Sequence, residues 1–178
     1  MNLGKSIIIL FLIAIFIAIL ISIFTPEKEA VVPVFPESII VGTTSSYPDV
    51  NLISKTLANK VLKMDTIQLM IVDVPPKLQG EYEAYVVPGP VPHSYVIFLS
   101  PLVKRSVDLM RVLSHEFAHI KQYESKRLIP VNIQTGLYVW EGDTINFARI
   151  PYEKRGFEIE AFRIEKELKS ELYSILYP

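Results

Sequence analysis

Apolar positions along this chain of 178 residues follow two periods, which predict a succession of helices and strands. From Asp49 to about Lys63 the apolar residues recur at helical spacing, so we expect a helix with Asp49 as its N-cap. Three later runs are rich in β-branched and aromatic residues and end near proline or glycine, which predicts strands. These strands are residues 66–74, 82–87 and 94–100.

A second helix is predicted from Ser106 to about Tyr123, because apolar residues again recur at helical spacing after a serine N-cap. A last helix extends from about residue 152 or 153 through Leu176. Between these helices, Gly142-Asp143 predicts the turn of a hairpin. The strands of this hairpin are residues 135–141 and 144–148.

Together these elements predict an α+β domain. A small mixed or antiparallel sheet of about three strands covers the second helix, and a hairpin and a long helix follow. The chain contains no cysteine, which excludes disulfides, thiol catalysis and cysteine–zinc sites. Its formal net charge is −1 and it has no long basic cluster, so we expect no binding to nucleic acid.

The N-terminal part of the chain has a different pattern, because residues 7–24 carry no charge and are almost all apolar. We interpret residues 6–24 as an uncleaved transmembrane signal anchor after a short tail of residues 1–5; a cleaved signal peptide is the alternative. Positive charge before the span favours a cytoplasmic N-terminus and a domain outside the cytoplasm. Residues 25–44 contain three prolines and are predicted to form a linker to the folded domain, residues 45–178.

The most informative motif is His115-Glu116-Phe117-Ala118-His119, which falls inside the second predicted helix. Positions i and i+4 lie on one face of a helix, so both imidazoles can bind one Zn²⁺. Glu116 lies beside the first histidine, where its carboxylate can take a proton from a water that the metal activates. The alternative is a helix whose histidines only face solvent or satisfy polar groups of the core.

A catalytic zinc uses three protein ligands and leaves one position open for water. Because the chain lacks cysteine, the third ligand must be His93 or a carboxylate. The acidic stretch 157–165 is the favoured source, since Glu158 and Glu165 share one helical face and Glu160 points elsewhere. An amphipathic helix with solvated glutamates is the alternative. His93 lies in a proline-rich turn and is expected to be an exposed turn residue.

The segment HEFAHIKQ, followed by WEGDTINFARIPYEKRGFEIEA, resembles the minigluzincins, a family of small soluble metallopeptidases, and the resemblance covers about Ser45 to the C-terminus. It implies that a glutamate of a downstream helix is the third zinc ligand; the family's glutamate-x-x-alanine pattern falls on Glu158, with Glu160 as the fallback. It also implies an edge strand that aligns the substrate, for which SYVIFLS (residues 94–100) is the candidate. It further implies latency through a terminal segment in the cleft, here Leu172 to Pro178. The N-terminal anchor departs from the soluble pattern of the family.

The sequence therefore predicts a membrane-anchored zinc endopeptidase with one Zn²⁺ per chain. His115, His119 and Glu158 would hold the metal, and Glu116 would be the catalytic base. The expected partners are a peptide or protein substrate and the membrane, through the N-terminal helix. The alternatives are a membrane-tethered domain with a structural or degenerate zinc site, and an interaction module without metal.

Two further roles have several candidates at this stage. A donor must stabilise the oxyanion, and other groups must orient the two histidines through their second ring nitrogens. Gln122 is expected to cap or brace its helix. The oxyanion candidates are Tyr123, Tyr152, Arg155 and His93, and the orienting candidates are Glu153, Glu160 and backbone carbonyls.

Overall fold

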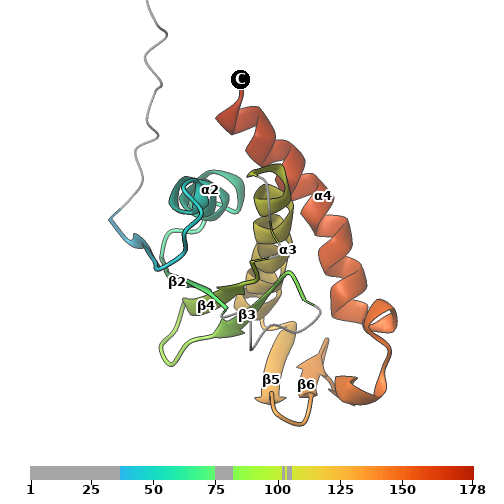
Figure 1. Cartoon of the computed structure of the whole chain (residues 1–178). Helices are drawn as coiled ribbons and strands as arrows, with labels where there is room; N and C mark the ends of the chain where they lie inside the picture. Colours follow the sequence, from blue (N-terminus) through green and yellow to red (C-terminus); the bar gives the residue numbers. More distant parts are fainter. Residues whose placement is uncertain (1–36, 75–81, 102, 104–105) are drawn as a thin grey trace, which may run out of the picture. The chain divides into compact units, whose positions relative to one another are not determined.

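Two β-sheets and three α-helices are present in the computed structural model, which describes residues 37–74, 82–101, 103 and 106–178 (Figure 1). The first sheet contains β1 (Ile39–Thr43), β2 (Ile67–Asp73), β3 (Ala84–Pro88) and β4 (Ser94–Leu99). The second sheet contains β5 (Leu128–Asn132), β6 (Leu137–Trp140) and β7 (Asp143–Asn146). The helices are α2 (Val50–Thr56), α3 (Ser106–Glu124) and α4 (Gly156–Leu176). Shorter helical segments are η1 (Leu57–Val61), η3 (Phe147–Arg149) and η4 (Tyr152–Lys154).

The first sheet is mixed, with the strand order β1-β2-β4-β3. β1, β2 and β4 are parallel, and β3 pairs antiparallel with β4 at the edge of the sheet. The candidate strand SYVIFLS is therefore wrong as an edge strand, because β4 has a neighbour on each side. Its nearly continuous apolar sequence matches a central strand, whereas the shorter strand β3 takes the edge.

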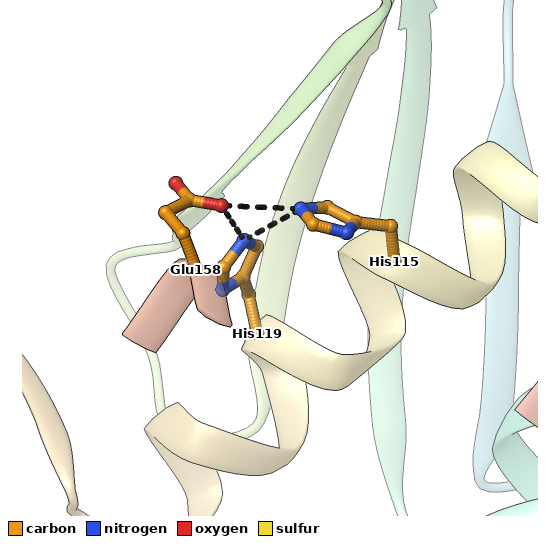
Figure 2. A group of neighbouring side chains, drawn as sticks. All are labelled: His115, His119 and Glu158. Carbon is orange, nitrogen blue, oxygen red and sulfur yellow. Dashed lines mark hydrogen bonds and ion pairs between the residues drawn. The ribbon is translucent and has the colours of Figure 1, made fainter. Parts of the chain in front are cut away.

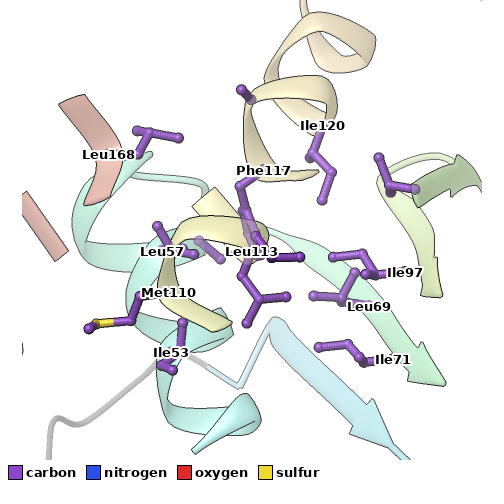
Figure 3. Packing of buried hydrophobic residues seen from close by; sticks show 14 of the residues in the cluster. Ile53, Leu57, Leu69, Ile71, Ile97, Met110, Leu113, Phe117, Ile120 and Leu168 are labelled. Carbon is purple, nitrogen blue, oxygen red and sulfur yellow. The ribbon is translucent and has the colours of Figure 1, made fainter. Parts of the chain in front are cut away.

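The main core lies between the first sheet and the helices (Figure 3). Alternate residues of β2 point toward it, since Ile67, Leu69 and Ile71 are buried while Gln68 and Met70 are exposed. Phe117 on α3 is fully buried in this core, and burial of a side chain of this size stabilises the fold by about 1.5–3 kcal/mol. The apolar face of α3 therefore packs this helix, which carries the histidine motif, against the core.

The predicted α+β class is confirmed, and most predicted elements are present within a few residues of their expected ends. The first helix is one exception, because its second half is the π-helical segment η1. A second exception is β1, which occupies residues 39–43, inside the stretch that the sequence prediction assigned to the linker. This strand is short, and the prolines that precede it led to the prediction of a linker. Its parallel pairing with β2 defines it as a strand.

The second sheet contains the predicted hairpin, β6 and β7, which turns at Glu141 and Gly142. Sequence reasoning missed its third strand, β5, which pairs with β6 through an irregular register near Pro130. A second, smaller apolar cluster of Leu128, Phe147 and Phe157 lies under this sheet and connects it to the start of α4.

The predicted membrane anchor, residues 6–24, lies outside the described residues. Among the residues that the structure describes, no helix has the length and apolarity needed to cross a membrane.

The C-terminal segment does not lie in the cleft, so this expectation is wrong. Leu172 is 0% exposed in the main core, and α4 continues as far as Leu176. Ile164, Leu168 and Leu172 follow one another at four-residue spacing, which places all three on the buried face of α4. Leu172 is also 14 residues beyond Glu158 in the same helix, which corresponds to about 21 Å.

Candidate metal centre

The histidine motif lies in the middle of α3, where a helix places His115 and His119 one turn apart on the same face. Glu158 lies in the first turn of α4, which runs alongside α3 (Figure 1). Ala161, one turn later on α4, is 0% exposed. Its small side chain allows the two helices to pack closely, so that Glu158 reaches the histidines.

Three potential ligand atoms converge at this point (Figure 2). The two Nε2 atoms of His115 and His119 are 3.2 Å apart, and Glu158 Oε2 lies 3.2 Å from the first and 3.3 Å from the second. Two atoms bound to one tetrahedral zinc at 2.0–2.1 Å are roughly 3.3–3.4 Å apart. The spacing of the three atoms therefore matches three corners of a zinc tetrahedron, and all three residues are buried.

The other ring nitrogen of each histidine has a partner that acts as a hydrogen-bond acceptor. His119 Nδ1 is 2.9 Å from Gln122 Oε1, and His115 Nδ1 is 3.3 Å from Glu165 Oε2. Each Nδ1 therefore donates a proton to this acceptor, so a neutral imidazole has its lone pair on Nε2, which faces Glu158. Neutral imidazoles would place three acceptors face to face, and this repulsion is removed either by protons on Nε2, which then hydrogen-bond Glu158, or by a divalent cation between the three atoms. The donor set fits zinc.

A hydrogen-bond network fixes the orientation of Gln122, whose side chain is buried. Its Nε2 donates to the carbonyl of Phe157 at 2.9 Å and to Glu160 Oε2 at 3.0 Å. Glu160 in turn accepts from Arg127 at 2.8 and 3.0 Å, and Arg127 also pairs with Glu141 at the hairpin turn. The amide oxygen of Gln122 consequently has to face His119. The network connects this histidine to α4 and to the second sheet.

The charges of the protein groups alone also favour a cation at this point. Burial by itself would raise the pKa of the Glu158 carboxyl, but its hydrogen bonds to His115 and His119 lower this pKa to about 2. Burial would lower the pKa of His115, but the carboxylates of Glu158 and Glu165 raise it to about 9. Glu158 is thus a carboxylate at neutral pH, and positive charge is stabilised beside it.

Glu116 lies beside the three potential ligand residues but does not belong to that group. Its side chain is buried, and burial raises the pKa of its carboxyl. The backbone amide of Val86 hydrogen-bonds this carboxylate, whereas Oε2 has no hydrogen-bond partner within the described part of the chain. An unpaired carboxylate oxygen with a raised pKa is suited to accept a proton from a water molecule.

A half-open cleft of about 480 Å³ gives access to these groups. It is lined by His115, Glu116, His119 and Glu158, by residues of β3, and by residues of the second sheet and of η3. Four aromatic side chains from α3, β6, η3 and α4 also line it; they are Tyr123, Tyr138, Phe147 and Phe157. A cleft of this volume accommodates part of a peptide side by side with the metal ligands.

Among the described strands, β3 has no neighbour at its outer edge, and its residues line this cleft. Gly89 N donates to Ser94 O, and Ser100 N donates to Glu83 O, so the odd-numbered positions of β3 are bonded to β4. In an antiparallel pair these positions alternate with positions whose backbone groups point away, which here are Ala84 and Val86. The contact between Val86 and Glu116 confirms this direction. An extended peptide can therefore pair with β3 directly above the candidate metal site.

The other residues singled out in the sequence have separate places. His93 pairs with Glu124 at 2.7 Å and is not part of the ligand group. Glu160, the fallback ligand, pairs with Arg127 and Gln122 instead. Tyr152 donates a hydrogen bond of 2.7 Å to Glu158 Oε2, and burial followed by the charge of Glu158 raises the pKa of its hydroxyl, so it remains a donor.

Sequence reasoning missed the contacts of Gln122 and Glu165 with the two histidines. Gln122 was expected only to brace its helix, although its position three residues after His119 places it on the same helical face. Glu165 was assigned to the face of Glu158, and that placement was the available signal for its contact with His115. Glu153, a predicted orienting group, lies in η4 and is not among the recorded partners of either histidine.

The arrangement combines a divalent-metal ligand set, a buried carboxylate beside it, a hydroxyl donor and a strand edge over a cleft. These are the groups needed to activate a water and to hold an extended chain next to it. No family model, curated protein or solved structure matches the chain at a significant level.

Proposed function

We propose that this protein is a zinc-dependent endopeptidase of the minigluzincin type. The observation that carries the proposal is the set of distances of 3.2–3.3 Å among His115 Nε2, His119 Nε2 and Glu158 Oε2. These are the separations expected around one tetrahedral zinc, and the three residues line the cleft. A purely structural zinc site would have no use for the buried carboxylate of Glu116 beside the ligands.

Each group of the site has a role in this proposal. A bound zinc ion would polarise the scissile carbonyl and lower the pKa of the attacking water. Glu116 accepts the proton of this water at its unpaired Oε2 and later transfers the proton to the leaving amine. Tyr152 keeps its hydroxyl proton, which it donates to Glu158 in the structure, and would turn this hydroxyl to donate to the developing oxyanion instead. The substrate would lie extended along β3 through the backbone groups of Ala84 and the carbonyl of Val86, since the Val86 amide hydrogen-bonds Glu116.

The proposed setting is a membrane surface. The apolar run of residues 6–24 would anchor the chain, and residues from about 45 onward would act outside the cytoplasm on peptides or unfolded segments of proteins. A half-open cleft with a strand edge favours extended segments, because a folded domain does not present its backbone in this way.

The test uses the full-length chain purified in detergent. Zinc content is measured for the wild type, Glu158→Ala and Glu160→Ala, and cleavage of an unfolded protein such as casein is measured for the wild type and Glu116→Gln. We expect one zinc per wild-type chain, loss of zinc in Glu158→Ala, and retention in Glu160→Ala. Glu116→Gln should keep its zinc and lose a factor of about 10²–10⁴ in activity.

Three results would contradict the proposal, each at a different step. Normal zinc binding by Glu158→Ala would show that the third ligand is another residue. Zinc binding without any cleavage by the wild type would favour a non-catalytic metal domain. Absence of zinc from the wild type would overturn the metal site itself.

A further inference from the structure

Arg155 is the single arginine among the described residues that line the cleft, and these residues include no lysine. It is half-buried immediately before α4, three residues ahead of Glu158. Its Nε donates to the carbonyl of Ile150 at 3.1 Å, and its guanidinium carbon lies 5.5 Å from the centre of the Tyr152 ring. These two contacts hold the guanidinium in place beside the tyrosine whose hydroxyl contacts Glu158.

Arg155 differs from the other arginines near the site, because none of the described carboxylates pairs with it. Arg111 pairs with Glu83, and Arg127 pairs with Glu141 and Glu160. Within the described part of the chain, the hydrogen bond of Arg155 is made by Nε to the Ile150 carbonyl. The other N–H donors lie in the plane of the guanidinium, a geometry that matches the two oxygens of a carboxylate.

The balance of charges in the cleft also indicates that Arg155 is available to bind an anion. Glu116 and Glu158 are its two described acidic groups, and their charges balance those of one divalent cation. The positive charge of Arg155 is then left without compensation inside the cleft. Tyr138, which lies near Arg155, is half-buried and supplies a neutral wall. A site of this kind favours a substrate with a negative charge that meets the guanidinium.

We infer that Arg155 recognises a substrate carboxylate close to the scissile bond, and so selects peptides with an acidic group there. The inference rests on the proposed peptidase function. Because one tyrosine ring separates the guanidinium from the metal ligands, the carboxylate belongs within about three residues of the scissile bond, given roughly 3.3–3.6 Å per residue of extended chain. The carboxylate can come from an aspartate or glutamate side chain or from the C-terminus of the substrate.

The test compares three peptides that share one cleavable sequence. The first is neutral and blocked at both ends, the second replaces one glutamine near the scissile bond by glutamate, and the third is neutral with a free C-terminal carboxylate. The ratio of kcat/KM for each charged peptide to that for the neutral peptide is measured with the full-length, zinc-loaded protein, for wild type, Arg155→Met and Arg155→Lys. Lys154→Met is the matched control, because Lys154 is exposed and is absent from the cleft lining.

We expect the wild type to prefer one charged peptide by about tenfold or more, as for a charge-assisted hydrogen bond. The ratio should fall to about one in Arg155→Met, recover in part in Arg155→Lys, and remain at the wild-type value in Lys154→Met. The peptide that shows the effect identifies the source of the carboxylate. A wild-type ratio near one, or a ratio that Arg155→Met leaves unchanged, would overturn the inference. An equal loss for all three peptides would also overturn it, because it would indicate that Arg155 acts on the oxyanion or on folding.

A second readout does not depend on catalysis. Fluorescence anisotropy of labelled peptides measures their affinity for the zinc-loaded Glu116→Gln variant, with and without Arg155→Met. Tighter binding of a charged peptide that Arg155→Met abolishes would support the inference even if no peptide is cleaved. Absence of cleavage together with this binding would contradict the peptidase proposal alone, whereas equal affinities for charged and neutral peptides would contradict the role of Arg155.

Discussion

Replacement of Gln122 by methionine removes the hydrogen bonds that orient His119 while it keeps a side chain of similar volume. In the structure, the Gln122 side chain is 1% exposed and contacts His119, the Phe157 carbonyl and Glu160. The variant leaves the Nδ1 proton of His119 without an acceptor, so the imidazole can rotate or change tautomer. Loss of such a partner lowers metal affinity by about 10–100-fold, which corresponds to about 1.4–2.7 kcal/mol.

The same change should also lower the stability of the protein in the absence of zinc. The Phe157 carbonyl and the Glu160 carboxylate would each lose one donor, and loss of a hydrogen bond of this kind costs about 0.5–1.5 kcal/mol. Zinc affinity is measured by competition with a chromophoric chelator, and the free energy of unfolding by urea titration in the presence of EDTA. Lys121→Met is the control, because the neighbouring Lys121 is exposed on the same helix.

The two measurements separate an effect on the metal from an effect on folding. If Gln122→Met destabilises the protein but binds zinc within twofold of the wild type, the orientation of His119 by Gln122 is refuted. If Lys121→Met loses as much zinc affinity as Gln122→Met, the loss comes from the helix in general and the same conclusion holds.

Three other predictions concern packing and metal removal. Gly156→Ala should lower the free energy of unfolding by about 1–3 kcal/mol in urea titration, since the added Cβ would lie 2.8 Å from Trp140 Nε1. The control Gly42→Ala should lower it less, because its Cβ meets the flexible Met70 side chain. An equal loss in the two variants would contradict this reasoning. Leu172→Ala should lose about 2–5 kcal/mol and should not increase the rate of casein cleavage, whereas activation would restore the idea of an inhibitory tail. Addition of zinc at 100 times its dissociation constant should stabilise the EDTA-treated protein by about 2.7 kcal/mol in thermal unfolding, and His115→Ala should show no such gain; an identical gain in that variant would place the metal elsewhere.

The local pattern of the sequence was sufficient for most elements of the fold. Helical spacing predicted α3 and α4, and β-branched runs with proline ends predicted β2, β3 and β4. The pattern was insufficient for β1 and β5, which are short strands with nearby prolines. Their strand character comes from hydrogen bonds to partners that are distant in sequence, so a local window contains little information about them.

The sequence also contained the identity of the central residues of the candidate site, because one helical turn places His115 and His119 on a common face without help from the rest of the chain. Tertiary packing decided which carboxylate approaches them: the small Ala161 lets α4 come close with Glu158 inward, and Arg127 holds Glu160 away. It also decided that β3, rather than β4, offers its edge to the cleft, and that Gln122 and Glu165 contact the second ring nitrogens. Periodicity along one element specifies which residues share a face, whereas only the packing of two elements against each other specifies which faces meet.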